Sequence, residues 1–304
     1  MNDPMAKPSS PALWWMAIRP KTLGLAVSPV VLATALAWRE TGELARPEIP
    51  LIILLCAIAI QAGTNLFNDA EDHLNGTDDE QRLGPPRITA LGWALPHHVS
   101  AAGLFAFLIA LLGGSYLVQT GGWPIFFSGL AALWAGYLYS RGPFPISRSP
   151  FGEIVVIVFF GLFAVTGTLY LMTGDIPTSA YLWGTVMGLP AGAVLMLNNI
   201  RDLDSDRRAG RKTLAIVLGD TTARKFYAAM MIAPFALIVV SVANDATEIG
   251  TLFGFAAFLF TMKTVRAVRK TPAGTSLNPL LARTVQGQTL LALTAAFGLA
   301  FVSI

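Results

Sequence analysis

Charged residues are scarce in this sequence, and cysteine is nearly absent. Only 13% of the 304 residues are charged, whereas soluble domains contain about 25%, so an ordinary water-soluble domain is excluded. The single cysteine, Cys56, excludes an internal disulfide and a thiolate metal cluster. The three histidines form no metal-binding pattern. In place of charge the chain has hydrophobic residues, which make up 54% of it, and a mean hydropathy of +0.59.

Long uncharged runs dominate the chain. A helix needs about 20 apolar residues to cross a hydrocarbon layer of about 30 Å. The runs are residues 22–38, 49–68, 99–118, 123–140, 154–173, 180–200, 226–244, 249–262 and 284–304. Lipid leaves unpaired backbone groups without partners, so such spans must be helical. The sequence therefore predicts an all-α integral membrane protein with nine transmembrane helices, of which 249–262 is the shortest. We predict that the chain forms a single transmembrane domain over residues 1–304, with a polar N-terminal tail at residues 1–18.

Basic residues are distributed unevenly between the two sides of this predicted bundle. Of the 21 Lys and Arg residues, all but Arg39 and Arg46 fall in the N-terminal tail or in loops after the even-numbered spans. Cytoplasmic loops of membrane proteins are enriched in Lys and Arg. We therefore predict a multi-pass protein of the cell inner membrane with a cytoplasmic N-terminus. The excess of basic residues that gives the pI of 9.1 is therefore explained by the membrane topology, and no nucleic-acid partner is predicted.

Two clusters of acidic residues lie at the predicted cytoplasmic ends of the second and sixth spans, within residues 65–87 and 198–213. Each has Asn followed by Asp residues at helical spacing, and then Gly and Arg. Residues three or four positions apart share a helix face. The two rows that result are Asn65, Asn68, Asp69 and Asp72, and Asn198, Asp202 and Asp206.

Two such rows facing one another across a bundle would present several oxygen ligands. Mg²⁺ prefers oxygen, takes one or two carboxylates, and completes its shell with water and substrate phosphates. The pattern therefore indicates a Mg²⁺ site that binds a diphosphate. Nearby bases that could neutralise the remaining phosphate charge are Arg82, Arg87, Arg141, Arg207, Arg208, Arg211 and Lys212.

Other interpretations fit the acidic clusters less well. Solvated loops would explain one cluster, but two clusters with matched spacing and sidedness favour a functional site, because ionisable groups near membrane depth are costly. A transporter would place its site near the bilayer midplane at broken helices, whereas both rows lie at helix ends. A CDP-alcohol phosphotransferase would need Gly after Asp72, where this chain has His73.

The strings "NDAEDHLNGTD" (68–78) and "DLDSD" (202–206) resemble the two aspartate-rich motifs of the UbiA superfamily of intramembrane aromatic prenyltransferases. The first motif usually reads N-D-x-x-D-x-x-x-D, but its last position here is Gly76, and the next acidic residue is Asp78. Further strings are similar to the menaquinone-pathway branch, 1,4-dihydroxy-2-naphthoate polyprenyltransferase. They are "RPKTL" (19–23), "NGTDDEQRLGPPR" (75–87), "GPFPISRSPFGEI" (142–154), "FFG" (159–161), "GTLYLMTG" (167–174) and "NNIRDLDSDRRAGRKTLAIVLG" (198–219).

The resemblance implies nine helices around a central cavity and a Mg²⁺-dependent polyprenyltransferase. Its substrates would be polyprenyl diphosphate and the aromatic acid 1,4-dihydroxy-2-naphthoate, and its products demethylmenaquinol, diphosphate and CO₂. The implied metal ligands are Asn68, Asp72, Asp202 and Asp206. The implied catalytic residues are Asp72, Asp202, Asp206 and Arg141. The implied substrate-binding residues are Asn65, Asn68, Asp69, Arg82, Arg87, Tyr137, Asn198, Arg19 and Lys212.

Two of these assignments depend on position within a motif. Tyr137 and Arg141 occupy a Y-x-x-x-K pattern of the family, with Arg in place of Lys. Arg19 could anchor the acceptor carboxylate or serve only as a positive-inside anchor. The alternatives 4-hydroxybenzoate, homogentisate and haem stay open as acceptors. The prenyl chain length, the oligomeric state, protein partners and the role of Asp78 also stay open.

Overall fold

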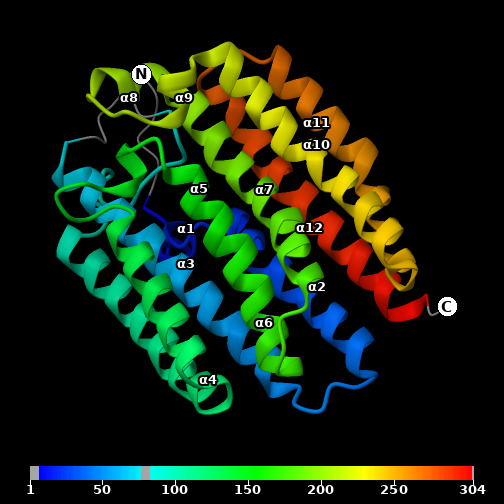
Figure 1. The fold of residues 1–304 in the computed structure, drawn as a ribbon. Helices are drawn as coiled ribbons and strands as arrows, with labels where there is room; N and C mark the ends of the chain where they lie inside the picture. The colour runs from blue at the N-terminus through cyan, green and yellow to red at the C-terminus, as the bar shows by residue number, and fades with distance from the viewer. Residues whose placement is uncertain (1–6, 77–82, 303–304) are drawn as a thin grey trace.

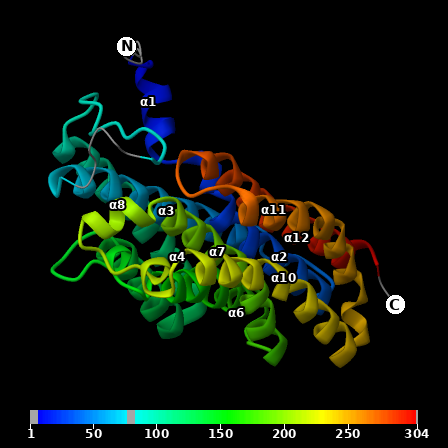
Figure 2. The same ribbon diagram turned by 90° about the horizontal axis from the view of Figure 1, so that it is seen from above.

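The part of the chain that the structure describes, residues 7–76 and 83–302 of a computed structural model, contains helices and no strand. The long helices lie side by side along one general direction (Figure 1). Seen from above, α7 (Thr178–Arg201) lies inside the bundle, while α1 (Ser10–Ala17) extends away from it (Figure 2). The all-α prediction is confirmed over these residues.

The remaining α-helices are α2 (Gly24–Thr41), α3 (Glu48–Leu74), α4 (Pro96–Leu138), α5 (Gly152–Ile157), α6 (Ala164–Thr173), α8 (Leu203–Arg208), α9 (Leu214–Leu218), α10 (Asp220–Asn244), α11 (Phe258–Lys270) and α12 (Asn278–Phe301). The 3-10 segments are η1 (Pro20–Thr22), η2 (Ile146–Arg148), η4 (Ala246–Ala257) and η5 (Thr275–Leu277). The segment η3 (Val158–Phe163) is a π-helix that joins α5 to α6.

Seven helices among the described residues are long and apolar enough to cross a membrane. An eighth results if the bent pair Ser10–Thr22 and Gly24–Thr41, which meet at 55°, counts as one span. The multi-pass prediction is confirmed to this extent. The short run predicted at 249–262 belongs to a longer helix, Ala246–Lys270. The predicted run began at residue 249 because Glu248, in the first turn of this helix, is charged. In the structure Glu248 is buried and accepts a hydrogen bond from the Trp183 indole at 3.1 Å.

Helix α4 contains 43 residues, about twice the length needed to cross the hydrocarbon layer. Gly122 interrupts it with non-helical φ 63° and ψ −152°, a left-handed conformation that glycine adopts at little cost. Beyond this point the chain folds back. A Cβ placed on Gly136 would lie 3.0 Å from the ring of Phe107, so the two limbs of α4 pack side by side.

The N-terminal region differs from the polar tail predicted for residues 1–18. Residues 10–17 form α1, and Leu13 and Ala17 pack into a buried cluster with Leu66, Ala70 and Ile88. The physical reason is local, because the segment "SPALWWMA" is mostly apolar and places a proline in the first turn of its helix.

Close packing in the centre of the bundle depends on glycine. In α7, 72% of the most apolar window is buried, and Trp183 is fully enclosed. A Cβ added at Gly161 would lie 2.3 Å from the Gly184 carbonyl oxygen and 2.5 Å from the Gly188 Cα. Small residues allow membrane helices to approach this closely, and the contact holds η3 against α7.

Candidate functional site

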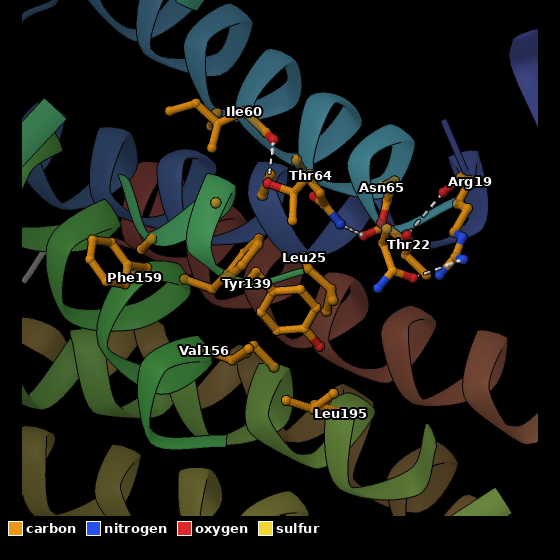
Figure 3. A pocket seen from close by; sticks show the side chains of 18 of the residues that line it. Arg19, Thr22, Leu25, Ile60, Thr64, Asn65, Tyr139, Val156, Phe159 and Leu195 are labelled. Atoms are coloured by element: carbon orange, nitrogen blue, oxygen red, sulfur yellow. Dashed lines mark hydrogen bonds between the residues drawn. The ribbon is translucent and has the colours of Figure 1, made fainter. Parts of the chain in front are cut away.

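A cavity of about 1230 Å³ lies between the helices, above the range of about 300–1,000 Å³ that is usual for small-molecule sites. One end is charged and the other is apolar. Figure 3 shows Arg19, Thr22 and Asn65 at one end, Phe159 and Val156 toward the other, and Tyr139 between them. The cavity can therefore hold a molecule with an anionic head and a long apolar tail.

The second limb of α4 and η3 contribute large apolar side chains to the cavity lining. They are Ile125, Phe126, Leu133, Phe159, Phe160 and Phe163. The wider turn of a π-helix changes which side chains face one direction, and such turns are frequent at functional sites. Here η3 directs three phenylalanines to the cavity wall.

The first predicted row reaches the charged end through Asn68 and Asp72 on α3. Asp72 is 6% exposed. Its Oδ2 lies 2.7 Å from Nη1 of Arg87, and its Oδ1 lies 3.0 Å from Nη2 of Arg211. Arg87 also donates to both the side-chain and backbone oxygens of Asn68. The structure thus brings three of the predicted residues, Asn68, Asp72 and Arg87, into one buried network.

Arg19 enters the same end from the bend between α1 and α2. Its backbone has φ 57° and ψ 64°, a region that residues other than glycine seldom adopt. The Arg19 carbonyl accepts from the backbone N–H and hydroxyl of Thr22, at 3.0 and 2.9 Å. Asn65 fixes the bend by donating to the Ile18 carbonyl at 3.0 Å. As a result the guanidinium lies on the cavity wall, with Nη2 3.4 Å from Oδ1 of Asn68.

All three members of the second row, Asn198, Asp202 and Asp206, line the cavity. Helix α7 ends at Arg201, yet the Asp206 N–H donates to the Asp202 carbonyl at 2.8 Å, so the predicted i, i+4 spacing survives the break. Arg201 donates to Oδ1 of Asn198 at 2.7 Å and to Oδ1 of Asp202 at 2.8 Å. Asn278 accepts from Arg201 at 3.0 Å and so holds this arginine in place.

Arg211 joins the two rows. Its Nη2 binds Asp72, and its Nη1 lies 3.2 Å from Oδ1 of Asp206. Asp206 is 5% exposed, and burial raises its pKa to about 6 although the charge of Arg211 acts in the opposite direction. The two acidic clusters, predicted from spacing to face each other, therefore meet at one guanidinium group.

The donor set of the charged end suits a hard cation. Three carboxylates and two side-chain amides supply oxygen ligands, which Mg²⁺ prefers. Within the described residues, no three His, Cys, Asp or Glu side chains form a ready-made metal centre. The guanidinium of Arg211 lies between the carboxylates of Asp72 and Asp206. The residues fit Mg²⁺ in their chemistry, provided that the arginines give up these carboxylates.

Asp69 lies elsewhere. It is 3% exposed and is not among the cavity-lining residues. Its carboxylate accepts from the backbone N–H groups of Ile88 and Thr89, each at 3.2 Å, and from the Thr89 hydroxyl. Asp69 thus holds the segment that presents Arg87, and its predicted contact with substrate stays a prediction.

Arg141 and Tyr137 are likewise not among the residues that line the cavity. Arg141 pairs with Glu71 at 2.7 Å and donates to the Ser100 hydroxyl at 2.7 Å. Tyr137 packs edge-on against Phe67, with ring centroids 5.8 Å apart. Both residues connect α4 to its neighbours. Their predicted catalytic and binding roles find no geometric support.

Lys212 and Arg82 are the last two of the predicted substrate-binding residues. Lys212 is exposed, is not a cavity-lining residue, and donates its backbone N–H to the Arg148 carbonyl at 3.0 Å. Arg82, like Asp78, lies outside the described residues.

The sequence-based analysis missed Tyr139 and Arg201, which both line the cavity. Tyr139 lies two positions after Tyr137, about 200° further around a helix, so the two rings face different directions. The Y-x-x-x-K match selected Tyr137, which is not among the residues that line the cavity. Arg201 lies three positions after Asn198, and the same spacing argument that selected the aspartates could have found it.

A helical membrane bundle with this cavity is the architecture of an intramembrane protein that can hold a molecule with an anionic group and an apolar chain. The sequence model of the UbiA prenyltransferase family matches residues 26–280. The 1,4-dihydroxy-2-naphthoate octaprenyltransferase of Escherichia coli (strain K12) is 33% identical to this chain over 286 residues, covering 91% of each. Its counterpart in Mycobacterium tuberculosis is 32% identical and covers 95% of this chain and 97% of the relative.

The fold comparison agrees. A UbiA homolog from Archaeoglobus fulgidus, solved with GPP and Mg²⁺ bound, has a TM-score of 0.68 at 14% identity, covering 95% of this chain and 99% of that one. The chain belongs to the UbiA prenyltransferase family, and it is therefore a membrane-embedded polyprenyltransferase. The resemblance seen in the aspartate-rich motifs is confirmed.

Proposed function

We propose that the protein transfers a polyprenyl group from polyprenyl diphosphate to 1,4-dihydroxy-2-naphthoate, releasing diphosphate and CO₂ and giving demethylmenaquinol. One observation carries the proposal: a single cavity joins an arginine-rich charged end to a long apolar wall. The named activity of relatives that match over nearly the whole chain supports the choice of acceptor.

The donor diphosphate binds at the charged end, with Arg87 and Arg211 on its oxygens and the prenyl chain along the phenylalanines of η3. Planar guanidinium groups bind phosphate oxygens in pairs. Asn68, Asp72, Asp202 and Asp206 would hold Mg²⁺, whose bound charge would stabilise the leaving diphosphate.

Transfer breaks the allylic C–O bond, and its electron pair leaves with the diphosphate. The ring carbon that carries the carboxylate supplies the electron pair for the new C–C bond. The bond from that carbon to the carboxylate then breaks, and its electron pair returns to the ring as CO₂ leaves, which restores the aromatic ring. The arginines stabilise the charge that develops on the diphosphate oxygens. The apolar wall keeps water from the allylic centre, where it would otherwise compete with the acceptor.

The acceptor occupies the region between the charged end and the apolar wall. Tyr139 lies there, and Arg19 is close enough to the proposed donor site to contact Asn68. We assign Tyr139 to packing against the aromatic ring and Arg19 to holding its carboxylate before this is lost.

The topology that we propose is nine crossings of the cell inner membrane with a cytoplasmic N-terminus. The fold-back of α4 at Gly122 and the bent pair at the N-terminus support the number, and the distribution of Lys and Arg supports the orientation. In a Cys56→Ala background, Glu43→Cys should react with a membrane-impermeant maleimide added outside the cell, whereas Ser9→Cys should react only after lysis. The opposite labelling would invert the topology.

The activity is tested with the purified protein, Mg²⁺ and radiolabelled polyprenyl diphosphate, offered either 1,4-dihydroxy-2-naphthoate or 4-hydroxybenzoate. We expect labelled prenyl-naphthoquinol and CO₂ from the first acceptor. Product from 4-hydroxybenzoate alone would preserve the chemistry and replace the acceptor. Folded protein that labels neither acceptor would overturn the proposal.

A further inference from the structure

Every oxygen ligand proposed for Mg²⁺ is bound in this structure by an arginine of the same chain. The pairs are Arg87 with Asn68 and Asp72, Arg201 with Asn198 and Asp202, and Arg211 with Asp72 and Asp206. These three guanidinium charges match the three carboxylate charges, and Arg19, whose Nη2 lies 3.4 Å from Oδ1 of Asn68, adds a further positive charge at the same end. The carboxylates are thus neutralised by arginines of the chain, and the three arginines paired with them are only 3–13% exposed at their side chains.

This balance sets a condition on metal binding. A divalent cation that entered alone would displace a guanidinium from its carboxylate and leave it buried without an anionic partner, which is strongly unfavourable. If a diphosphate enters with the cation, the carboxylates bind the metal and the guanidinium groups bind phosphate. Every charge then keeps an opposite partner.

Arg211 is the arginine best placed to change partners. Its guanidinium contacts one carboxylate from each row, Asp72 and Asp206. Arg87 is also held by the backbone oxygen of Asn68, and Arg201 by Asn278. Within the described residues, the buried Nε of Arg211 has no hydrogen-bond partner, so it is a donor available to an incoming phosphate oxygen.

We propose that Arg211 leaves Asp72 and Asp206 for the diphosphate of the donor, so that metal and diphosphate bind together and each raises the affinity for the other. This inference rests on the proposed function and adds that its metal and its diphosphate bind cooperatively. The coupling must be reciprocal, because binding free energies are linked. Couplings of this kind are typically about 5- to 150-fold.

The test uses the full chain in detergent, Mn²⁺ as the metal and inorganic pyrophosphate as the anion. Electron paramagnetic resonance measures free Mn²⁺, and equilibrium dialysis measures labelled pyrophosphate against a protein-free chamber. We expect the wild-type protein to bind pyrophosphate at least fivefold more tightly with Mn²⁺ than without it. We expect Arg211→Gln to bind Mn²⁺ alone at least fivefold more tightly than the wild type, and to lose most of the enhancement by Mn²⁺.

Two further variants separate this exchange from a general effect of charge. Arg266→Gln removes an exposed arginine of α11 that does not line the cavity and should behave as the wild type. Arg211→Lys keeps the charge and should restore weak binding of Mn²⁺ alone. Unchanged Mn²⁺ affinity in Arg211→Gln, or pyrophosphate binding in the wild type that does not depend on Mn²⁺, would overturn the inference.

The two proposals fail in different ways. Coupled binding in a protein that forms no prenylated product would refute the proposed function and leave the exchange standing. Prenyl transfer by a protein that binds metal and pyrophosphate independently would refute the exchange and leave the proposed function standing. Folded wild-type protein that binds neither ligand in any combination would overturn both.

Discussion

The carboxylates of Asp72 and Asp206 bind the same guanidinium group, that of Arg211, at 3.0 and 3.2 Å. Asp72 is near the end of α3, and Asp206 is on α8, so the pair forms only when the two halves of the bundle pack together. The charged end of the cavity is therefore a product of the fold rather than of either motif alone.

Replacing either carboxylate of this pair by the amide of the same size should strongly reduce transfer. We expect Asp72→Asn and Asp206→Asn each to lower kcat/KM by about 100-fold or more, the scale seen when one charge-stabilising group is removed from an active site. The measurement is prenyl transfer from labelled donor per folded protein. Asp204→Asn is the matched control, because Asp204 is on the same short helix but exposed. Equal losses in all three variants would contradict a specific role.

The two tyrosines of "YLYSR" should respond differently to substitution. Tyr139→Leu should raise the KM for the aromatic acceptor about tenfold, since an aromatic contact contributes about 0.5–1.5 kcal/mol and 1.4 kcal/mol is tenfold. Tyr137→Leu should leave this KM unchanged and lower the thermal unfolding midpoint, because it removes the contacts with Phe67 and Trp134. A KM effect confined to Tyr137→Leu would return that residue to the site.

Arg141 should act on stability rather than on chemistry. Arg141→Ala removes the ion pair with Glu71 and the hydrogen bond to Ser100, both of which are partly buried. We expect a loss of about 1–3 kcal/mol in the free energy of unfolding, measured by thermal unfolding in detergent. Activity per folded molecule should change less than about threefold, a change below 1 kcal/mol in the barrier. A large drop in kcat at unchanged stability would support the catalytic role predicted from the motif.

The close approach of η3 to α7 predicts a contrast between two glycines of one span. Gly161→Ala should strongly destabilise the protein, because its Cβ would collide with backbone atoms of Gly184 and Gly188, which cannot turn away. At Gly167 an added Cβ meets nothing within 4 Å, so Gly167→Ala should be neutral or slightly stabilising through its helix propensity. Thermal unfolding of the two variants distinguishes them, and equal midpoints would contradict the packing described here.

Some of the site could be predicted because its information is local. Helical spacing selected seven residues. The structure places all of them except Asp69 on the cavity wall, namely Asn65, Asn68, Asp72, Asn198, Asp202 and Asp206. Spacing within a helix depends only on the backbone repeat, which packing does not alter. The match to a motif was less reliable for Tyr137 and Arg141, since a motif position does not state which way a helix face turns.

The sequence by itself determined that this chain lies in a membrane, that it is helical, and which oxygen ligands share a helix face. Each of these follows from short-range chemistry, namely uncharged length, the backbone's need for hydrogen bonds in lipid, and the helical repeat. Only the tertiary structure decided that Arg211 joins the two rows, that Asp69 supports a loop, and that Tyr139 rather than Tyr137 lines the cavity. Those outcomes depend on how helices far apart in the chain rotate and pack against one another. The spacing of residues along one helix carries no information about this packing.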